Sequence, residues 1–218
     1  MSFSEYVEGM RGYLPRLETH RRALHQIPEL GYREQKTHDY IMRHLQALAP
    51  DDLRVFAQTG VRAVFRGSGE GRTVAFRADM DALPVDEATG CAFASRHAGC
   101  MHACGHDGHM ANLLTFAEWV AEHRDALKDY VVLLFQPAEE TVGGAKRMID
   151  EGALDDPHVD VVYGMHMMPD VPKGKIACCA GPIMAQTSEI DFVIHGRSAH
   201  GATPHLGVDA ITAMAHLL

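Results

Sequence analysis

The 218-residue sequence contains no apolar run approaching the roughly 20 residues that a membrane-spanning helix requires. Positive charge is also scarce: 20 lysines and arginines stand against 29 aspartates and glutamates, for a formal net charge of −9. Without a basic stripe to neutralise phosphates, the composition argues against a nucleic-acid partner. These two shortages therefore predict a protein that binds neither membrane nor nucleic acid.

Cysteine pairs typical of a disulfide framework are missing as well. The five cysteines are an odd number, and Cys178 and Cys179 are adjacent. A reducing compartment fits such a pattern better. The N-terminal stretch MSFSEYVEGMRGYLPRLE is polar and mixed in charge, which is typical of neither a signal peptide nor a transit peptide. We therefore expect a cytoplasmic location.

What the sequence does contain is an alternation of two apolar patterns. Helical spacing of apolar residues occurs over 4–25, 33–49, 107–123 and 143–152. Short runs rich in Val, Phe and Leu, typical of buried strands, occur at 61–65, 73–78, 130–135 and 159–165. Strands that alternate with helices predict an α/β fold in which helices cover both faces of a sheet.

The pattern changes near residue 187. The segment SEIDFVIHG, residues 188–196, alternates apolar and polar residues as a half-exposed strand does. A Gly/Ser/His loop follows, and VDAITAMAHLL, from residue 208, has the pattern of a helix that is still running at residue 218. We expect one domain over residues 1–186 and the beginning of a second over 187–218.

Three of the predicted buried strands lead into side chains that can bind a metal ion. One runs into Asp79 and Asp81, the next into Glu139 and Glu140, and the last into His166. In open α/β sheets the carboxyl ends of strands converge on one crevice. Ionisable groups there are costly to bury unpaired, and a cation is one way to pair them. Taken singly each is most simply a solvated loop residue, but the three together favour a site.

The densest cluster is MHACGHDGH, residues 101–109. Cys104 and His106 can address one cation from the same side of a turn, and thiolate with imidazole suits zinc or a similar metal. A helix beginning near Asp107 would help to keep Cys104 as thiolate through its positive N-terminal end. A structural zinc site or a Cys-His nucleophile pair are the alternatives.

The pair Glu139-Glu140 has two interpretations. It is either an acidic first turn of the following helix, or a pair in which one carboxylate binds metal while the other faces the substrate water. His166 alone is more often a core histidine than a ligand. Other histidines, His25 among them, are interpreted as surface or packing residues.

These motifs, in this order, resemble the dinuclear-metal aminoacylase and carboxypeptidase family, in its hippurate hydrolase and auxin-conjugate amidohydrolase branch. The resemblance spans nearly the whole chain. It is carried by the segments HRRALHQIPELGYREQKT (20–37), RADMDALP (77–84), MHACGHDGHMANLL (101–114), FQPAEETVGGAKRMIDEG (135–152), GMHMMPDVPKGKI (164–176), GPIMA (181–185) and GRSAHGATPHLGVDAI (196–211).

The resemblance implies a zinc-exopeptidase-like mixed sheet over residues 1–186 and the beginning of a smaller α+β lid and dimerisation domain over 187–218. It implies two divalent cations, zinc or manganese, in a homodimeric protein. The implied metal ligands are Cys104, His106, Glu140 and His166.

Three further roles follow from the same resemblance. Glu139 would be the general base and acid, and Asp81 would fix the orientation of a ligand. His200 would reach the partner subunit's site and stabilise the tetrahedral oxyanion. The family's chain also continues beyond the lid domain and brings one further histidine ligand, so we expect this sequence to lack that part.

The predicted function is hydrolysis of the amide bond of an N-acyl amino acid of the hippurate type by metal-activated water. A carboxypeptidase or dipeptidase with the same metals is the first alternative. A metal-binding remnant without activity is the second, because a ligand would be missing.

Overall fold

The computed structural model describes residues 3–69, 71–141, 143–185 and 190–217. It divides into two units, Met1–Pro169 and Asp170–Leu218, each described by itself below. The predicted domain boundary between residues 186 and 187 lies outside the described residues and stays a prediction.

A five-stranded mixed sheet organises the first unit, with the strand order β1-β2-β4-β3-β5. The strands are β1 Asp52–Phe56, β2 Gly60–Phe65, β3 Thr73–Asp79, β4 Tyr130–Gln136 and β5 Val161–Gly164. β2 pairs antiparallel with both β1 and β4, whereas β3 pairs parallel with both β4 and β5. The carboxyl ends of β4, β3 and β5 therefore lie side by side at one edge of the sheet.

The sequence of the central strand β4 is continuously apolar because both of its faces are buried. Val131, Leu133 and Phe135 pack into one buried cluster, and Val132 and Leu134 pack into another on the opposite face. A strand covered on both faces has no solvent side, so the alternation of polar and apolar residues disappears.

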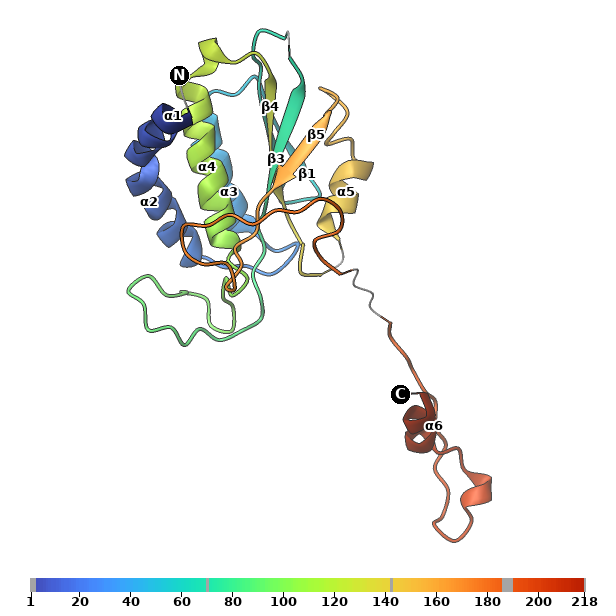
Figure 1. The fold of residues 1–218 in the computed structure, drawn as a ribbon. Helices are drawn as coiled ribbons and strands as arrows, with labels where there is room; N and C mark the ends of the chain where they lie inside the picture. Colours follow the sequence, from blue (N-terminus) through green and yellow to red (C-terminus); the bar gives the residue numbers. More distant parts are fainter. Residues whose placement is uncertain (1–2, 70, 142, 186–189, 218) are drawn as a thin grey trace. The chain divides into compact units, whose positions relative to one another are not determined.

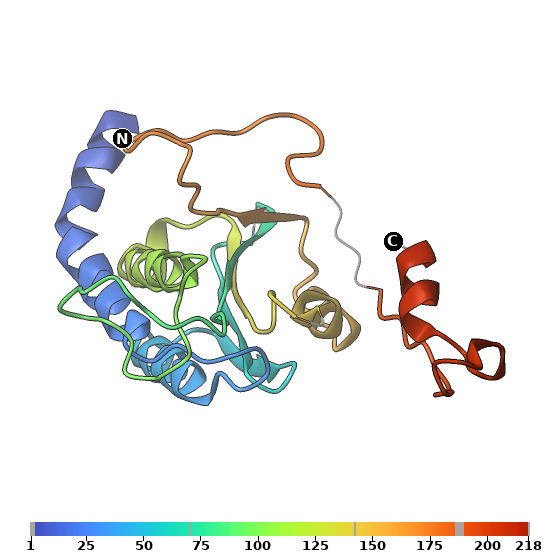
Figure 2. The same ribbon diagram turned by 90° about the horizontal axis from the view of Figure 1, so that it is seen from below.

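Helices cover both faces, as predicted. On one side lie the helices α1 Phe3–Met10, α2 Leu14–His25, α3 Gln35–Ala47 and α4 His106–Glu122, and on the other lies α5 Gly144–Asp150 (Figures 1 and 2). Leu24, Ile41 and Leu114 pack against the first face of the sheet, and Met148 packs against the second. The mixed α/β architecture expected from the sequence is confirmed.

The predicted elements differ from the structure in two places within this unit. The predicted helix over 4–25 is interrupted by the 3-10 turn η1 Arg11–Tyr13. Pro15 stands in the first turn of α2, where its missing N–H is tolerated but where a continuous helix would need that donor. β1 was not predicted, because this edge strand is only partly buried and has no clear apolar pattern.

In the second unit, the predicted final helix is present as α6 Ala210–Leu217. The Asp209 carboxylate caps it by accepting the backbone N–H groups of Ile211 and Thr212, at 3.0 and 3.2 Å. The predicted strand over 188–196 is not formed at residues 190–196, and residues 188 and 189 lie outside the described residues. A strand needs a partner, and among the described residues of this unit pairing is limited to one bridge between Arg197 and Val208. None of the helices in the described part of the chain is long and apolar enough to cross a membrane.

Candidate metal centre

The predicted site residues of the first unit meet at the carboxyl ends of the parallel strands. β3 leads into Asp79 and Asp81, β4 into the turn that carries Glu139 and Glu140, and β5 into His166. The loop before α4 reaches the same edge. Its last residue, Gly105, has φ +88°, and a Cβ there would lie 3.2 Å from the sulfur of Met167. Glycine therefore lets the chain turn sharply from Cys104 into the helix.

The four predicted ligands come close together. Ligand atoms of Cys104, His106 and Glu140 all lie within 4.8 Å of one another. His106 Nε2 is 3.6 Å from Glu140 Oε1, and Cys104 Sγ is 3.4 Å from His166 Nε2. Their role as metal ligands stays a prediction, but the fold brings the required atoms into one place.

The hydrogen bonds around His106 determine which ring nitrogen faces the cluster. Nδ1 lies 2.8 Å from the backbone carbonyl of Asp81, which can only accept, so Nδ1 carries the proton and Nε2 has a free lone pair. Within the described residues, His106 Nε2 and Glu140 Oε1 are buried without a hydrogen-bond partner. Buried polar atoms are rarely without a partner in proteins. A divalent cation is a partner that suits both the imidazole nitrogen and the carboxylate oxygen.

The electrostatics also indicate a missing positive charge. Burial, together with Glu140, raises the pKa of the Cys104 thiol to about 12. Burial and the neighbouring Glu140 raise the pKa of Glu139. Burial alone would lower the pKa of His106, but the carboxylates of Asp81, Asp79 and Glu140 outweigh it and raise that pKa. Burial is the main cause of the shifts of Cys104 and Glu139, neighbouring carboxylates add to both and decide that of His106, and divalent cations would neutralise this negative charge.

The expected help of the helix N-terminus in ionising Cys104 stays a prediction. α4 begins at His106, two residues after Cys104. Burial and the carboxylates of Glu140, Asp79 and Glu139 raise the pKa of the thiol, and a bound cation would favour the thiolate.

The carboxylate of Asp81 accepts hydrogen bonds from the backbone N–H groups of Glu139 and Glu140. Its Oδ1 accepts the N–H of Glu139 at 3.0 Å, and its Oδ2 accepts the N–H of Glu140 at 2.9 Å. The predicted role of orienting a ligand is therefore compatible with the geometry, through the main chain of Glu140 and the carbonyl contact to His106.

We expect Asp81→Asn to weaken metal binding by roughly 10–100-fold, the usual effect of losing an outer partner of a ligand. An amide can accept only one of the two N–H groups, so the turn that carries Glu139 and Glu140 would move. Zinc affinity by competition with a chromophoric chelator measures this. Asp39→Asn, on the exposed side of α3, serves as the matched control, and equal affinity in both variants would contradict the assignment.

Glu34 supports the same turn from the other side, which the sequence did not indicate. The side chain is fully buried, and its carboxylate accepts the N–H of Ala138 at 2.9 Å and the hydroxyl of Thr59 at 2.7 Å. Ala138 has φ +52°, a strained conformation for a non-glycine residue, so the turn has to be held in place by its contacts.

Glu34→Ala is expected to destabilise the protein by about 1–3 kcal/mol, because it leaves a buried N–H and a buried hydroxyl without acceptors. Glu34→Gln keeps an oxygen acceptor at this position and should lose less. Urea denaturation compares the two variants with the unchanged protein. A loss no larger for Glu34→Ala than for Glu34→Gln would show that the hydrogen bonds do not hold the turn.

Asp79, expected at the end of β3 as a side chain able to bind metal, belongs to the cluster, and so does His109, which was not predicted. His109 Nδ1 donates to Asp79 at 2.6 Å, and His109 Nε2 accepts the backbone N–H of Met167 at 2.9 Å, directly after His166. Burial would raise the pKa of Asp79, but the hydrogen bond from His109, together with Arg77 and His106, lowers it to about 2. His106 and His109 stand three residues apart on one helix face, and this spacing is the signal that could have identified His109 as part of the cluster.

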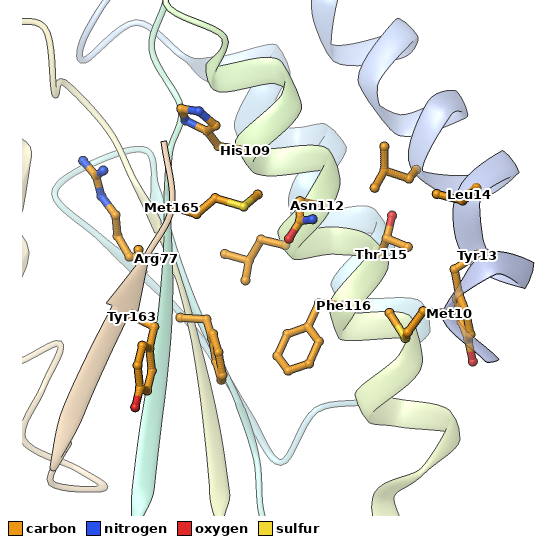
Figure 3. Close-up of a pocket in the computed structure, with 14 residues that line it drawn as sticks. Met10, Tyr13, Leu14, Arg77, His109, Asn112, Thr115, Phe116, Tyr163 and Met165 are labelled. Carbon is orange, nitrogen blue, oxygen red and sulfur yellow. The ribbon is translucent and has the colours of Figure 1, made fainter. Parts of the chain in front are cut away.

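Two pockets adjoin the cluster. One, of about 710 Å³, is lined by Cys104 and His166 together with Phe93, Met101 and Met168. The other, of about 500 Å³, lies between β5 and the helices, with His109 at one end and apolar side chains along its length (Figure 3). The cluster therefore has access to space that is large enough for a small-molecule substrate.

His200 belongs to the second unit. Its Nδ1 accepts the N–H of Ala202 at 3.2 Å, so a neutral ring carries its proton on Nε2, where it can act as a hydrogen-bond donor. Its predicted action across a dimer stays a prediction.

Fold and site together define an α/β protein with cysteine, histidine and carboxylate groups gathered at the carboxyl ends of its parallel strands. Residues 75–217 match the family described as peptidase family M20/M25/M40. The chain belongs to this family.

Similar proteins agree with this assignment. The chain is 42% identical over 207 residues to N-acetyldiaminopimelate deacetylase of Leuconostoc mesenteroides, covering 93% of this chain and 53% of that protein. It is 43% identical over 198 residues to N-acetyl-L-cysteine deacetylase of Bacillus subtilis, covering 91% and 47%. The chain thus spans about half the length of the curated relatives it matches.

Solved structures show the same fold. A candidate aminohydrolase from methicillin-resistant Staphylococcus aureus superposes with a TM-score of 0.81 at 36% identity, covering 99% of this chain and 57% of that one. A dinuclear metal binding peptidase of the M20 family from Bacillus subtilis superposes with a TM-score of 0.69 at 40% identity, covering 74% and 45%.

Proposed function

We propose that this chain carries most of the metal centre of an amidohydrolase that cleaves the amide bond of N-acyl amino acids. The observation that supports this most directly is the pair of buried, unpartnered atoms His106 Nε2 and Glu140 Oε1 beside the Cys104 thiol, with Glu139 adjacent. The similarity to two deacetylases of N-acetyl amino acids supports the same class of substrate.

The proposed ligands are Cys104, His106, Glu140 and His166, for two divalent cations of the zinc or manganese kind. When bound, the cations would polarise the substrate carbonyl and lower the pKa of a water molecule. Similarity to a dinuclear metal binding peptidase supports the number of two.

Glu139 performs the proton transfers in this proposal. Its carboxylate Oε2 lies 4.0 Å from His106 Nε2, so it faces the cluster, yet 41% of its side chain is exposed to solvent. The raised pKa brings the carboxyl nearer to neutral pH. Glu139 would accept the proton of the attacking water and deliver it to the departing amine.

His200 is proposed to stabilise the oxyanion from the partner subunit of a homodimer, because in the neutral tautomer its Nε2 carries a proton that it can donate. In this scheme residues 1–186 form the catalytic domain and 187–218 begin a lid and dimerisation domain.

The finer prediction concerns the acyl group. The pocket beside Cys104 and His166 has Phe93, Met101 and Met168 in its wall. An apolar wall of this kind would accept the aromatic ring of a hippurate-type substrate, whereas the similar curated proteins are named for N-acetyl substrates. We therefore propose N-acyl amino acids as the class and an aroyl group as the preferred acyl group.

The whole protein, loaded with zinc or manganese, should be assayed with hippurate, an N-acetyl amino acid and a dipeptide. We expect hippurate to be cleaved with the highest kcat/KM, chelation to abolish turnover, and added metal to restore it. Faster cleavage of the N-acetyl amino acid would reject the aroyl preference alone. Faster cleavage of the dipeptide would favour the peptidase alternative, and bound metal without any turnover would favour the remnant.

A further inference from the structure

A second group of potential ligands lies in the wall of the larger pocket, apart from the metal centre. His25 ends α2, while Glu87 and Cys91 belong to the segment of residues 84–100, which contains no helix or strand. One ligand atom from each of the three lies within 4.8 Å of the other two. None of these residues is a proposed ligand of the metal centre.

His25 is oriented by a carboxylate behind it. Its Nδ1 lies 2.8 Å from Asp107 Oδ2, and Arg21 Nε also contacts that oxygen, at 3.3 Å. With its Nδ1–H donated to Asp107, the ring directs Nε2 toward Glu87 Oε1 at 3.3 Å. Two acceptors face each other only when a positive charge, either a proton or a cation, lies between them. A carboxylate behind a histidine is the usual arrangement at metal sites.

Glu87 is also held in advance. Its Oε2 accepts the N–H of Ser95 at 2.5 Å, while its Oε1 accepts the Thr89 hydroxyl and also faces His25 and Cys91. Only 4% of its side chain is exposed. The Ser95 backbone N–H and the Thr89 hydroxyl lower the pKa of this carboxyl to about 2, so it is ionised at neutral pH.

The two separations that involve Glu87 Oε1 match those of a tetrahedral zinc site. Bonds of about 2.0 Å to nitrogen and oxygen and about 2.3 Å to sulfur place N and O about 3.3 Å apart, and S and O about 3.5 Å apart. The observed distances are 3.3 Å from His25 Nε2 to Glu87 Oε1 and 3.6 Å from Cys91 Sγ to Glu87 Oε1. Both distances from Glu87 Oε1 therefore fit one zinc ion, and ligand atoms of all three side chains lie within 4.8 Å of one another.

The surroundings provide access and a polar neighbour. His25 and Cys91 line the pocket of about 710 Å³, so an ion can enter and a water molecule can complete its coordination. The same pocket is lined by His102, which is only 4% exposed and whose two ring nitrogens have no partner among the described residues. The ring centroids of His102 and His25 are 6.5 Å apart. A water molecule bound to the ion would offer His102 a hydrogen-bond partner.

We propose that His25, Glu87 and Cys91 bind a further divalent cation of the zinc type, which fastens the segment of residues 84–100 to the end of α2. This segment forms part of the pocket wall beside the metal centre. The cation therefore serves as a structural clip for that wall. The proposal is independent of the proposed function, because its ligands take no part in the chemistry.

The test is a count of zinc on the whole protein after chelation and dialysis. Titration with zinc against a chromophoric chelator should show one equivalent fewer for Cys91→Ser than for the unchanged protein. The matched control Cys178→Ser replaces an exposed cysteine outside the cluster and should keep the full number. An unchanged zinc count in Cys91→Ser would overturn the proposal, and a proton would then be the charge between His25 and Glu87.

A second measurement does not depend on how the cysteine variant folds. Zinc should protect Cys91 of the unchanged protein from alkylation by iodoacetamide, as read by peptide mass spectrometry. In His25→Asn, the zinc concentration needed to protect Cys91 should rise by more than roughly 10–100-fold, which is the loss of affinity when only an outer partner of a ligand is removed. Equal alkylation of Cys91 with and without zinc would likewise overturn the site.

Discussion

Replacing Glu139 by glutamine should lower kcat of the whole protein by roughly 10²–10⁴, the usual contribution of a general base. The amide has nearly the same shape as the carboxyl group but cannot accept the proton of the attacking water. Metal binding should be retained, because Glu139 is placed by its backbone N–H on Asp81, which the substitution does not alter.

The measurement is kcat with hippurate together with metal per chain. Glu18→Gln, on the exposed surface of α2, is the matched control and should leave both values unchanged. Near-normal turnover of Glu139→Gln with a full metal content would remove Glu139 from the mechanism.

His200→Ala should lower kcat by on the order of 10²-fold or more, the effect of losing an oxyanion donor. Its Nε2–H would no longer be available to the developing negative charge on the substrate carbonyl. His205→Ala, five positions further along the same loop region, is the control and should retain activity.

Mixing His200→Ala with Glu139→Gln tests whether the donor comes from the partner subunit. After subunit exchange, half of the dimers are hybrids with one intact site, so about one quarter of the unchanged activity should return. No recovery after verified exchange would mean that His200 works within its own chain or has no role.

The candidate centre was largely predictable because its residues stand at positions that strand geometry brings together. Asp79, Glu139 and His166 follow three apolar runs, and the carboxyl ends of neighbouring parallel strands meet at one edge. The sequence alone showed which residue types lie at these ends, without the strand order.

Other parts of the site could not be predicted. Glu34 contacts Ala138 across 104 positions of the chain, and His25 contacts Glu87 across 62. His25 was interpreted as a surface or packing residue, but it is buried and paired with two carboxylates. Periodicity describes which face of its own element a residue occupies, and it carries no information about such distant partners.

The sequence by itself determined the class of fold, the chemical types of the candidate ligands and the turns in which they stand at the strand ends. It could do so because apolar periodicity and strand ends are local properties. Only the tertiary structure decided that Asp81 holds two backbone N–H groups, that His106 Nε2 and Glu140 Oε1 are left without partners, and that Asp79 and His109 fasten the loop of His166. Hydrogen bonds and burial depend on how the strands pair and how the helices pack on them, and these contacts form between segments far apart in the chain.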